Sequence, residues 1–182
     1  MGSEIKQKEY LDVLDEQGNK TGIVKSRGEI HKNNLWHREV AVLIFNLEGE
    51  ILLQKRSMDK KDAPGVWALC AGHVGLNETP LETLYKEVKE EVGIDIDIKK
   101  LTYMFTLRNN EEGNRHFIDI FKYITEDKIN EFKIQTEELT ALRFFNYEEV
   151  KKGALNNDPN LFLKNDEPTR CIFAWIDEKG IY

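Results

Sequence analysis

The chain has 182 residues and a mass of 21.3 kDa, with 33 acidic and 26 basic side chains and a formal net charge of −7. Its 40% hydrophobic and 10% aromatic residues supply the core of one folded domain and exclude disorder as the default state. The acidic balance argues against binding to nucleic acid as a polymer or to an anionic membrane, because both need a basic surface.

Membrane insertion and an oxidising compartment are also disfavoured. The longest apolar run, residues 40–45, is far shorter than the roughly 18–20 residues of a membrane span. No apolar stretch follows the first charges of the N-terminus, so no secretory signal is visible. Cys70 and Cys171 cannot form a disulfide framework, and the sequence contains no Cys-x-x-Cys pair. We therefore expect a cytoplasmic protein.

Short runs of apolar residues, several of them alternating with polar ones, predict a series of strands. A hairpin is expected over 11–24, around the turn residues Gln17, Gly18 and Asn19. One strongly helical stretch lies between the later strands, and this mixture favours an α/β or α+β layer architecture. Further strands are predicted at 38–45, 51–55, 66–71, 101–107 and 116–123, and weaker helices at 147–152 and 167–176.

The central helix is marked at both of its ends. Thr79 and Glu82 fit a capping box, and Pro80 falls at the first helical position. Gly93 can supply a left-handed stop at the C-terminal end. The apolar residues between these ends recur at helical spacing and predict one buried stripe, made of Leu81, Leu84, Tyr85, Val88 and Val92.

Three glutamates gather on one side of this helix. Glu87, Glu90 and Glu91 are spaced i, i+3 and i+4, without a lysine on that face. Like charges four residues apart destabilise a helix by about 0.2–0.5 kcal/mol unless a cation offsets them. Crowded carboxylate oxygens are the ligands that Mg²⁺ and Mn²⁺ prefer. The pattern indicates a divalent metal site, and a solvated acidic helix face is the alternative.

Residues 72–94, GHVGLNETPLETLYKEVKEEVGI, resemble the Nudix box. That box reads Gly, five residues, Glu, seven residues, then Arg-Glu-aliphatic-x-Glu-Glu-x-Gly-aliphatic. The one departure is Lys86, because the family has an arginine that pairs with the glutamate corresponding to Glu78. A lysine keeps the charge but loses the bidentate fork. The matching positions are Gly72, Glu78, Glu87, Val88, Glu90, Glu91, Gly93 and Ile94.

The resemblance implies a Nudix fold, in which a mixed β-sheet lies between helices. It implies one Nudix domain over 1–182, with an N-terminal hairpin extension at 1–35 and a C-terminal helical extension at 155–182. Many Nudix enzymes are homodimers, so the resemblance makes a homodimer one option for this chain.

The same resemblance implies a metal-dependent hydrolase of a small nucleoside diphosphate derivative. Three glutamates and the carbonyl of Gly72 would bind Mg²⁺ or Mn²⁺, which neutralise the diphosphate and activate water. Glu90 and Glu91 would be catalytic together with a general base, for which Glu138 or its neighbour Glu137 is the candidate. An exposed acidic turn is the alternative for these last two residues. The metal ligands would be Gly72, Glu87, Glu90 and Glu91.

A narrower resemblance, over 37–67 and the following Gly-His pair, is to the isopentenyl diphosphate isomerase branch of the same superfamily. That branch binds a metal through histidines and late glutamates, and it holds the substrate diphosphate through basic residues. Imidazole suits Mn, Fe or Zn better than Mg. Histidines that only pack or donate hydrogen bonds are the alternative. The matching positions are His31, His37, His73 and Glu138 for the metal, and Arg56 and Lys61 for the diphosphate.

The isomerase interpretation departs from this sequence at its key residue. The family's cysteine immediately before the Gly-His pair is replaced by Ala71. Cys70 lies one place too early, and a one-residue shift on a strand points its side chain to the opposite face. Thr136 also replaces one of the late glutamates. We therefore expect a hydrolase, with an isomerase-like enzyme and a non-catalytic sensor of a diphosphate ligand as the alternatives.

Overall fold

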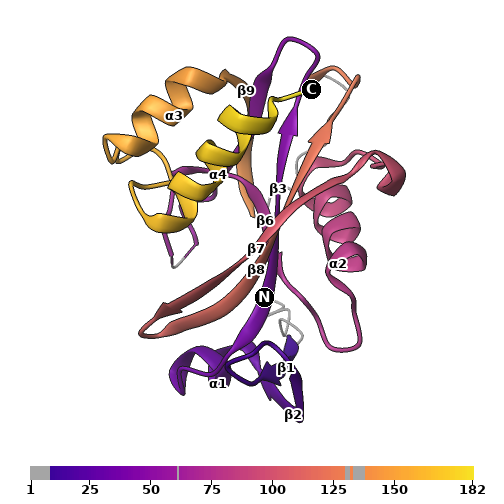
Figure 1. The fold of residues 1–182 in the computed structure, drawn as a ribbon, viewed down its shortest axis with the longest axis vertical. Helices are drawn as coiled ribbons and strands as arrows, with labels where there is room; N and C mark the ends of the chain where they lie inside the picture. The colour runs from indigo at the N-terminus through magenta and orange to yellow at the C-terminus, as the bar shows by residue number, and fades with distance from the viewer. Residues whose placement is uncertain (1–8, 61, 130–131, 133–137) are drawn as a thin grey trace, which may run out of the picture.

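One mixed sheet forms the centre of the computed structural model, which describes residues 9–60, 62–129, 132 and 138–182 (Figure 1). β3 (His37–Phe45) pairs in parallel with β8 (Asn114–Ile124) and antiparallel with two further strands. The strand order is β5-β4-β3-β8-β7, with β6 also paired to β3 and β9 to β4. The other strands are β4 (Glu50–Arg56), β5 (Trp67–Ala68), β6 (Cys70–His73), β7 (Thr102–Glu111) and β9 (Leu139–Asn146).

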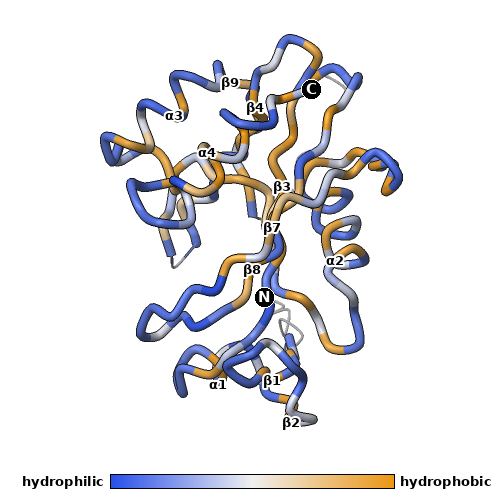
Figure 2. The backbone as a smooth tube through the Cα atoms, in the orientation of Figure 1, coloured by the Kyte–Doolittle hydropathy of each residue, from blue (hydrophilic) through white to orange (hydrophobic). Residues whose placement is uncertain are grey.

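Helices cover both faces of this sheet, as the resemblance implied. On one face lie α2 (Pro80–Glu87) and a π-helical turn, η1 (Val88–Val92); on the other lie α3 (Tyr147–Leu155) and α4 (Glu167–Lys179) (Figure 1). Two separate apolar clusters fill the two interfaces. Hydrophobic residues accordingly gather along the middle of the sheet in the backbone trace of Figure 2.

The apolar run 40–45 of β3 is explained by these two interfaces. Val40, Val42 and Ile44 pack toward α2, whereas Leu43 and Phe45 pack toward α3 and α4. Successive side chains of a strand point to opposite faces, so a strand covered on both sides is apolar without alternation. Residues paired across neighbouring strands lie on the same face of the sheet. The alternation along β3 therefore also shows on which face the site residues of β4, β6 and β8 lie.

The N-terminal segment forms the predicted hairpin, with β1 (Tyr10–Leu14) antiparallel to β2 (Lys20–Ser26). A short helix that the sequence did not predict, α1 (Arg27–Lys32), follows directly. Its start is a capping box in which the Glu29 carboxylate accepts from the backbone N–H and the hydroxyl of Ser26. This helix carries His31 toward the sheet.

Four details differ from the predictions. The single strand expected at 66–71 is two strands, because the chain leaves β4 after Ala68 and pairs with β3 from Cys70. β9 was not predicted. The strands expected at 101–107 and 116–123 extend further toward each other, since β7 and β8 stay paired up to Glu111 and Asn114. Leu81, assigned to the buried stripe, is exposed.

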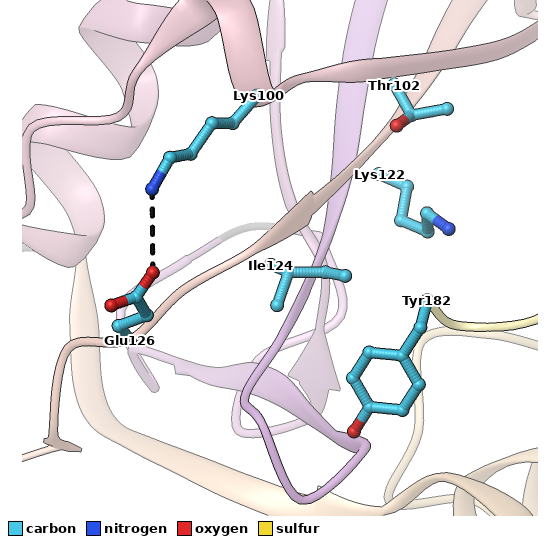
Figure 3. A pocket seen from close by; sticks show the side chains of 6 residues that line it. All are labelled: Lys100, Thr102, Lys122, Ile124, Glu126 and Tyr182. Atoms are coloured by element: carbon cyan, nitrogen blue, oxygen red, sulfur yellow. Dashed lines mark ion pairs between the residues drawn. The ribbon is translucent and has the colours of Figure 1, made fainter.

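The C-terminal residues pack back onto the sheet. Lys122 Nζ donates to the carbonyls of Gly180 and Ile181 at 3.2 and 2.7 Å. A cavity of about 340 Å³ lies beside this contact, and the ion pair between Lys100 and Glu126 crosses part of it (Figure 3). None of the residues lining this cavity was predicted to be a site residue. Its lining residues are Lys100, Thr102, Lys122, Ile124, Glu126 and Tyr182.

Two composition-based expectations can be compared with the structure. Cys70 and Cys171 are both free thiols, in agreement with the absence of a disulfide framework. Within the described residues, no helix has the length and apolarity needed to cross a membrane.

The 3₁₀ turn η2 (Ile98–Lys100) completes the described elements between the central helix and β7.

Candidate active site

The helix that carries the three glutamates widens at its C-terminal end. α2 ends at Glu87, and η1 closes with a hydrogen bond from the Gly93 N–H to the Val88 carbonyl at 3.0 Å. Gly93 then has φ of +79°, a conformation that favours glycine. π-helical turns occur frequently at functional sites. Here the widened turn carries Glu90 and Glu91.

The three carboxylates differ in exposure, and the backbone of Gly72 lies against one of them. Glu91 is buried with 7% of its surface exposed, Glu87 is half-buried and Glu90 is exposed. A Cβ atom on residue 72 would lie 2.5 Å from the carboxylate carbon of Glu87. Only glycine allows this approach without displacing the glutamate, so β6 and α2 meet where the resemblance placed the metal.

Burial and the charges of neighbouring carboxylates make Glu87 and Glu91 costly to ionise. Burial, followed by the charges of Glu91 and Glu90, raises the pKa of Glu87 to about 8. Burial also raises the pKa of Glu91, although hydrogen bonds from Gln54 and Cys70 act in the opposite direction. Like charges gathered in a low-dielectric site are stabilised by a cation. The donor set is oxygen-only, which fits Mg²⁺ or Mn²⁺.

The raised pKa of Glu87 predicts a stability change with pH. The group titrates near 4.5 in the unfolded chain and near 8 in the folded one, so the folded state holds an extra proton between these values. Stability should therefore fall as pH rises toward 8. His73, whose pKa burial lowers to about 3, gives the opposite slope only below about 6.5. In EDTA, the unfolding midpoint should drop by about 4–8 °C from pH 6.5 to 8.5.

A neutral substitution provides the check on this prediction. Glu87→Gln should flatten the slope above pH 6.5, because it removes the titrating group and keeps its shape. Glu126→Gln, at an exposed carboxylate that pairs with Lys100, should leave the slope in place. An identical slope in Glu87→Gln and wild type would assign the pH dependence to other groups.

The loop before the helix is held by the lysine that departs from the box. Lys86 Nζ lies 3.5 Å from Glu78 Oε1. The other carboxylate oxygen of Glu78 accepts from the hydroxyl of Thr83 at 2.7 Å. Thr83 is almost fully buried. The Thr83 hydroxyl thus donates to Glu78 the second hydrogen bond that the family's arginine would donate from its bidentate guanidinium.

Glu138, the candidate base, lies beside the glutamate cluster. Its charge raises the pKa of Glu91, whereas the charge of Lys60 lowers it. Lys60 Nζ and Glu138 Oε2 form an ion pair at 2.7 Å, and the Ser57 N–H donates to the Glu138 carbonyl at 2.8 Å. Two strands that are distant in sequence thus bring Glu138 close to the helix. Glu137, the other candidate, lies outside the described residues, as does Thr136.

The two predicted phosphate ligands have different outcomes. Arg56 donates from Nε and Nη2 to the carbonyls of Asp62 and Ala63, and its guanidinium lies 6.0 Å from the ring of Phe162. Its hydrogen bonds hold the loop after β4, so a role toward phosphate stays a prediction. Lys61 lies outside the described residues. Lys60, which the sequence reasoning missed, is the cationic side chain that pairs with Glu138.

All four histidines of the chain converge at a second centre, next to the first. His31 Nε2 and His73 Nε2 are 3.2 Å apart, and the rings of His37 and His73 stack with centroids 5.2 Å apart. The potential ligand atoms of His31, His37 and His73 lie within 4.8 Å of one another. His73 directly follows Gly72, so the two centres share β6.

Glu39 and His116 complete this second centre, and the sequence reasoning missed both. Glu39 Oε1 lies 3.1 Å from His37 Nε2, 3.4 Å from His73 Nε2 and 3.9 Å from His116 Nδ1. The hydrogen bond from His37 and the neighbouring histidines overcome the effect of burial and lower the pKa of Glu39 to about 2. His116 lies beside His37 because β3 and β8 pair in parallel, and this pairing joins residues far apart in the sequence. The only sequence signal for His116 was therefore the alternating pattern of the strand that it begins.

Cys70 and Ala71 occupy the faces that the strand argument predicted. Cys70 is buried in the cluster beneath α2, and its thiol donates to the Glu91 carboxylate. Ala71 is exposed. The position at which the resemblance places the reactive cysteine of the isomerases therefore holds the methyl group of Ala71. The neighbouring Cys70 thiol is hydrogen-bonded to Glu91.

Comparison with known proteins identifies the relatives of this chain. A family model described as NUDIX domain matches residues 35–165. Nudix hydrolase 3 of Arabidopsis thaliana is 34% identical over 164 residues, which cover 83% of this chain but only 21% of that protein. An uncharacterized Nudix hydrolase of Listeria monocytogenes is 36% identical over 149 residues, covering 79% of this chain and 83% of that one. This chain thus spans about a fifth of the Arabidopsis relative.

Similarity also extends to an isomerase and to a solved structure. Isopentenyl-diphosphate Delta-isomerase 2 of Photorhabdus laumondii is 27% identical over 159 residues, covering 85% of this chain and 86% of that protein. A crystal structure of a Deinococcus radiodurans protein superposes with a TM-score of 0.73 over 91% of this chain and 98% of that one. The two sequences are 16% identical, so this likeness shows the fold alone.

Proposed function

The chain belongs to the Nudix family, and on that premise we propose that it is a Mg²⁺- or Mn²⁺-dependent hydrolase that cleaves the diphosphate linkage of a small nucleoside diphosphate derivative. The observation that carries the proposal is the convergence of three box carboxylates with the Gly72 backbone and Glu138. Carboxylates gathered in this way repel one another, and a metal ion would supply the compensating positive charge.

In the proposed mechanism the residues of the box hold the ions, and a later loop moves the proton. Glu87, Glu90 and Glu91, with the Gly72 carbonyl, would bind the divalent ions. Those ions supply charge neutralisation of the diphosphate and a lowered pKa for the attacking water. Glu138 would accept a proton from the attacking water, while the bond from phosphorus to the bridging oxygen breaks and the second phosphate leaves. Lys60 pairs with Glu138 and keeps its carboxylate beside the cluster.

The histidine centre supports a separate cation site of different chemistry. Imidazole nitrogens with one carboxylate suit Mn, Fe or Zn better than Mg. His31, His37 and His73 are the predicted ligands, and Glu39 and His116 lie within reach of the same place. His37 Nδ1 faces the Leu35 carbonyl at 3.3 Å, as the outer nitrogen of a metal-bound histidine commonly does, so Nε2 is the nitrogen that faces Glu39 and the site.

We expect purified protein to carry about one transition metal ion per chain at this centre. His37→Gln should lower that content at least about tenfold, since it removes a buried ligand from the middle of the set. Elemental analysis by mass spectrometry after desalting measures the content. Glu91→Gln is the matched control and should keep the metal, because it alters only the oxygen-ligand cluster. Equal metal content in His37→Gln and wild type would contradict a histidine-bound ion.

The isomerase alternative is favoured by the same histidine centre and opposed by Ala71. A panel of nucleoside diphosphate derivatives and prenyl diphosphates separates the two, assayed with Mg²⁺ and with Mn²⁺ for cleavage of the diphosphate linkage and for double-bond migration. The proposal expects cleavage of at least one nucleoside diphosphate derivative into two phosphate monoesters and no double-bond migration. Isomerisation of isopentenyl diphosphate without phosphate release would overturn it, and ligand binding without any turnover would favour the sensor.

A further inference from the structure

Gln54 is a buried amide that faces the most deeply buried glutamate of the cluster. It lies on β4 with 3% of its surface exposed, on the sheet face covered by α2. Its Nε2 donates to Glu91 Oε2 at 2.8 Å and to the Leu69 carbonyl at 3.3 Å. The Cys70 thiol donates to the same carboxylate. Glu91 is therefore held from the sheet side by two donors.

The neighbours fix which way this amide points. The Leu69 carbonyl can only accept a hydrogen bond, so the NH₂ group that reaches both it and Glu91 must face them, and the amide oxygen must face away. Gln54 Oε1 is buried and has no hydrogen-bond partner among the described residues. A buried oxygen without a hydrogen bond destabilises the fold, and an apolar side chain at this position would avoid that cost.

We propose that Gln54 is a positioning residue for the metal site, fixing the Glu91 carboxylate through Oε2 so that Oε1 is left to bind the divalent ion. This inference rests on the proposed function, because it assigns Gln54 to the same metal cluster. A ligand whose rotamer is fixed by an outer hydrogen bond binds its ion without first being ordered. The amide is then retained, although its oxygen is unpaired, because its nitrogen orients the Glu91 carboxylate.

Mn²⁺ binding followed by electron paramagnetic resonance tests this without relying on turnover. The fraction of Mn²⁺ that Mg²⁺ displaces reports the oxygen-ligand cluster, since the histidine centre disfavours Mg²⁺. Gln54→Met keeps the length and apolar volume but removes both donors. It should weaken this displaceable Mn²⁺ binding about tenfold or more. Leu52→Met, on the same strand and facing the same cluster, controls for packing and should change the affinity less than twofold.

A double-mutant cycle shows whether Gln54 acts through Glu91. If it does, Gln54→Met should add little to the weakening already caused by Glu91→Gln, whereas independent effects would multiply. Gln54→Asn, which retains the amide but shortens its reach, should fall between wild type and Gln54→Met. It also serves as the test variant if the methionine variant fails to fold.

The outcomes separate this inference from the function on which it rests. Wild-type affinity in Gln54→Met, or weakening that multiplies with that of Glu91→Gln, would overturn the positioning role even if the enzyme hydrolyses diphosphates. Conversely, loss of Mn²⁺ affinity in Gln54→Met that disappears in the Glu91→Gln background supports the positioning role even if no substrate of the panel is cleaved. In that second case the proposed function fails and the metal cluster stands.

Discussion

Glu91→Gln should abolish divalent-metal-dependent hydrolysis and leave the fold intact. Glu91 is the buried glutamate of the cluster and the one held from the sheet by Gln54 and Cys70. The metal ion is expected to supply about 4 kcal/mol of charge stabilisation in the transition state, so its loss lowers kcat/KM roughly 10³-fold. Initial rates of nucleoside monophosphate formation with saturating Mg²⁺ measure this loss.

The stability of the Glu91→Gln variant distinguishes a lost ligand from a damaged fold. Burial already raises the pKa of Glu91, so a neutral side chain of the same shape should leave the unfolding midpoint unchanged or raise it. Glu178→Gln, at an exposed glutamate of α4, is the matched control and should retain full activity. Turnover within about threefold of wild type in Glu91→Gln would contradict the assignment of the cluster as the catalytic metal site.

Glu138→Gln should lower kcat by about 10²–10⁴-fold, the usual contribution of a general base. The glutamine keeps an oxygen that can accept from Lys60, and the backbone bond from Ser57 is unaffected, so the loop geometry should persist. Because the variant removes only proton transfer, KM and Mn²⁺ affinity should change little. A pH profile of kcat gives the diagnostic result, namely loss of the acidic limb that belongs to the base.

The control for Glu138→Gln is a carboxylate of similar type outside the site. Glu126→Gln removes the exposed partner of Lys100 and should leave kcat and its pH profile unchanged. A kcat within threefold of wild type in Glu138→Gln would remove Glu138 from the mechanism. The metal cluster would then stand without it, and the base would have to be sought among other groups.

The parts of the fold that could be predicted are those encoded locally. The capping box of Thr79 and Glu82 placed the start of α2, and Gly93 placed the end of its last turn. α1 was missed because six residues are too short for a periodic pattern, although its own capping box was readable. β9 was missed because Phe144 and Phe145 stand side by side, which breaks the alternation expected of a half-covered strand.

The candidate site was predictable only as far as its residues are neighbours in sequence. Glu87, Glu90 and Glu91 share one helix end, so spacing alone brought them together. Glu39 and His116 come from strands β3 and β8, whose parallel register joins residues almost eighty positions apart. No local pattern encodes that register, since it is set by how the whole sheet packs between its helices.

Gln54 illustrates the same limit. From the sequence it is one polar residue near the end of an apolar strand, and the expected interpretation would be a solvent-facing position. Its burial follows from β4 being covered by α2 on that face, and its partner lies 37 residues further along the chain. Contacts of this kind require the assembled fold.

Hydrolysis in H₂¹⁸O, followed by ³¹P NMR, tests the central claim most directly. With Mg²⁺ or Mn²⁺ and a nucleoside diphosphate derivative from the panel, wild type should release a phosphate product carrying one ¹⁸O atom from the attacking water. Glu91→Gln should yield no such product above background. Metal-independent incorporation, or conversion of a prenyl diphosphate without any ¹⁸O in phosphate, would contradict the account.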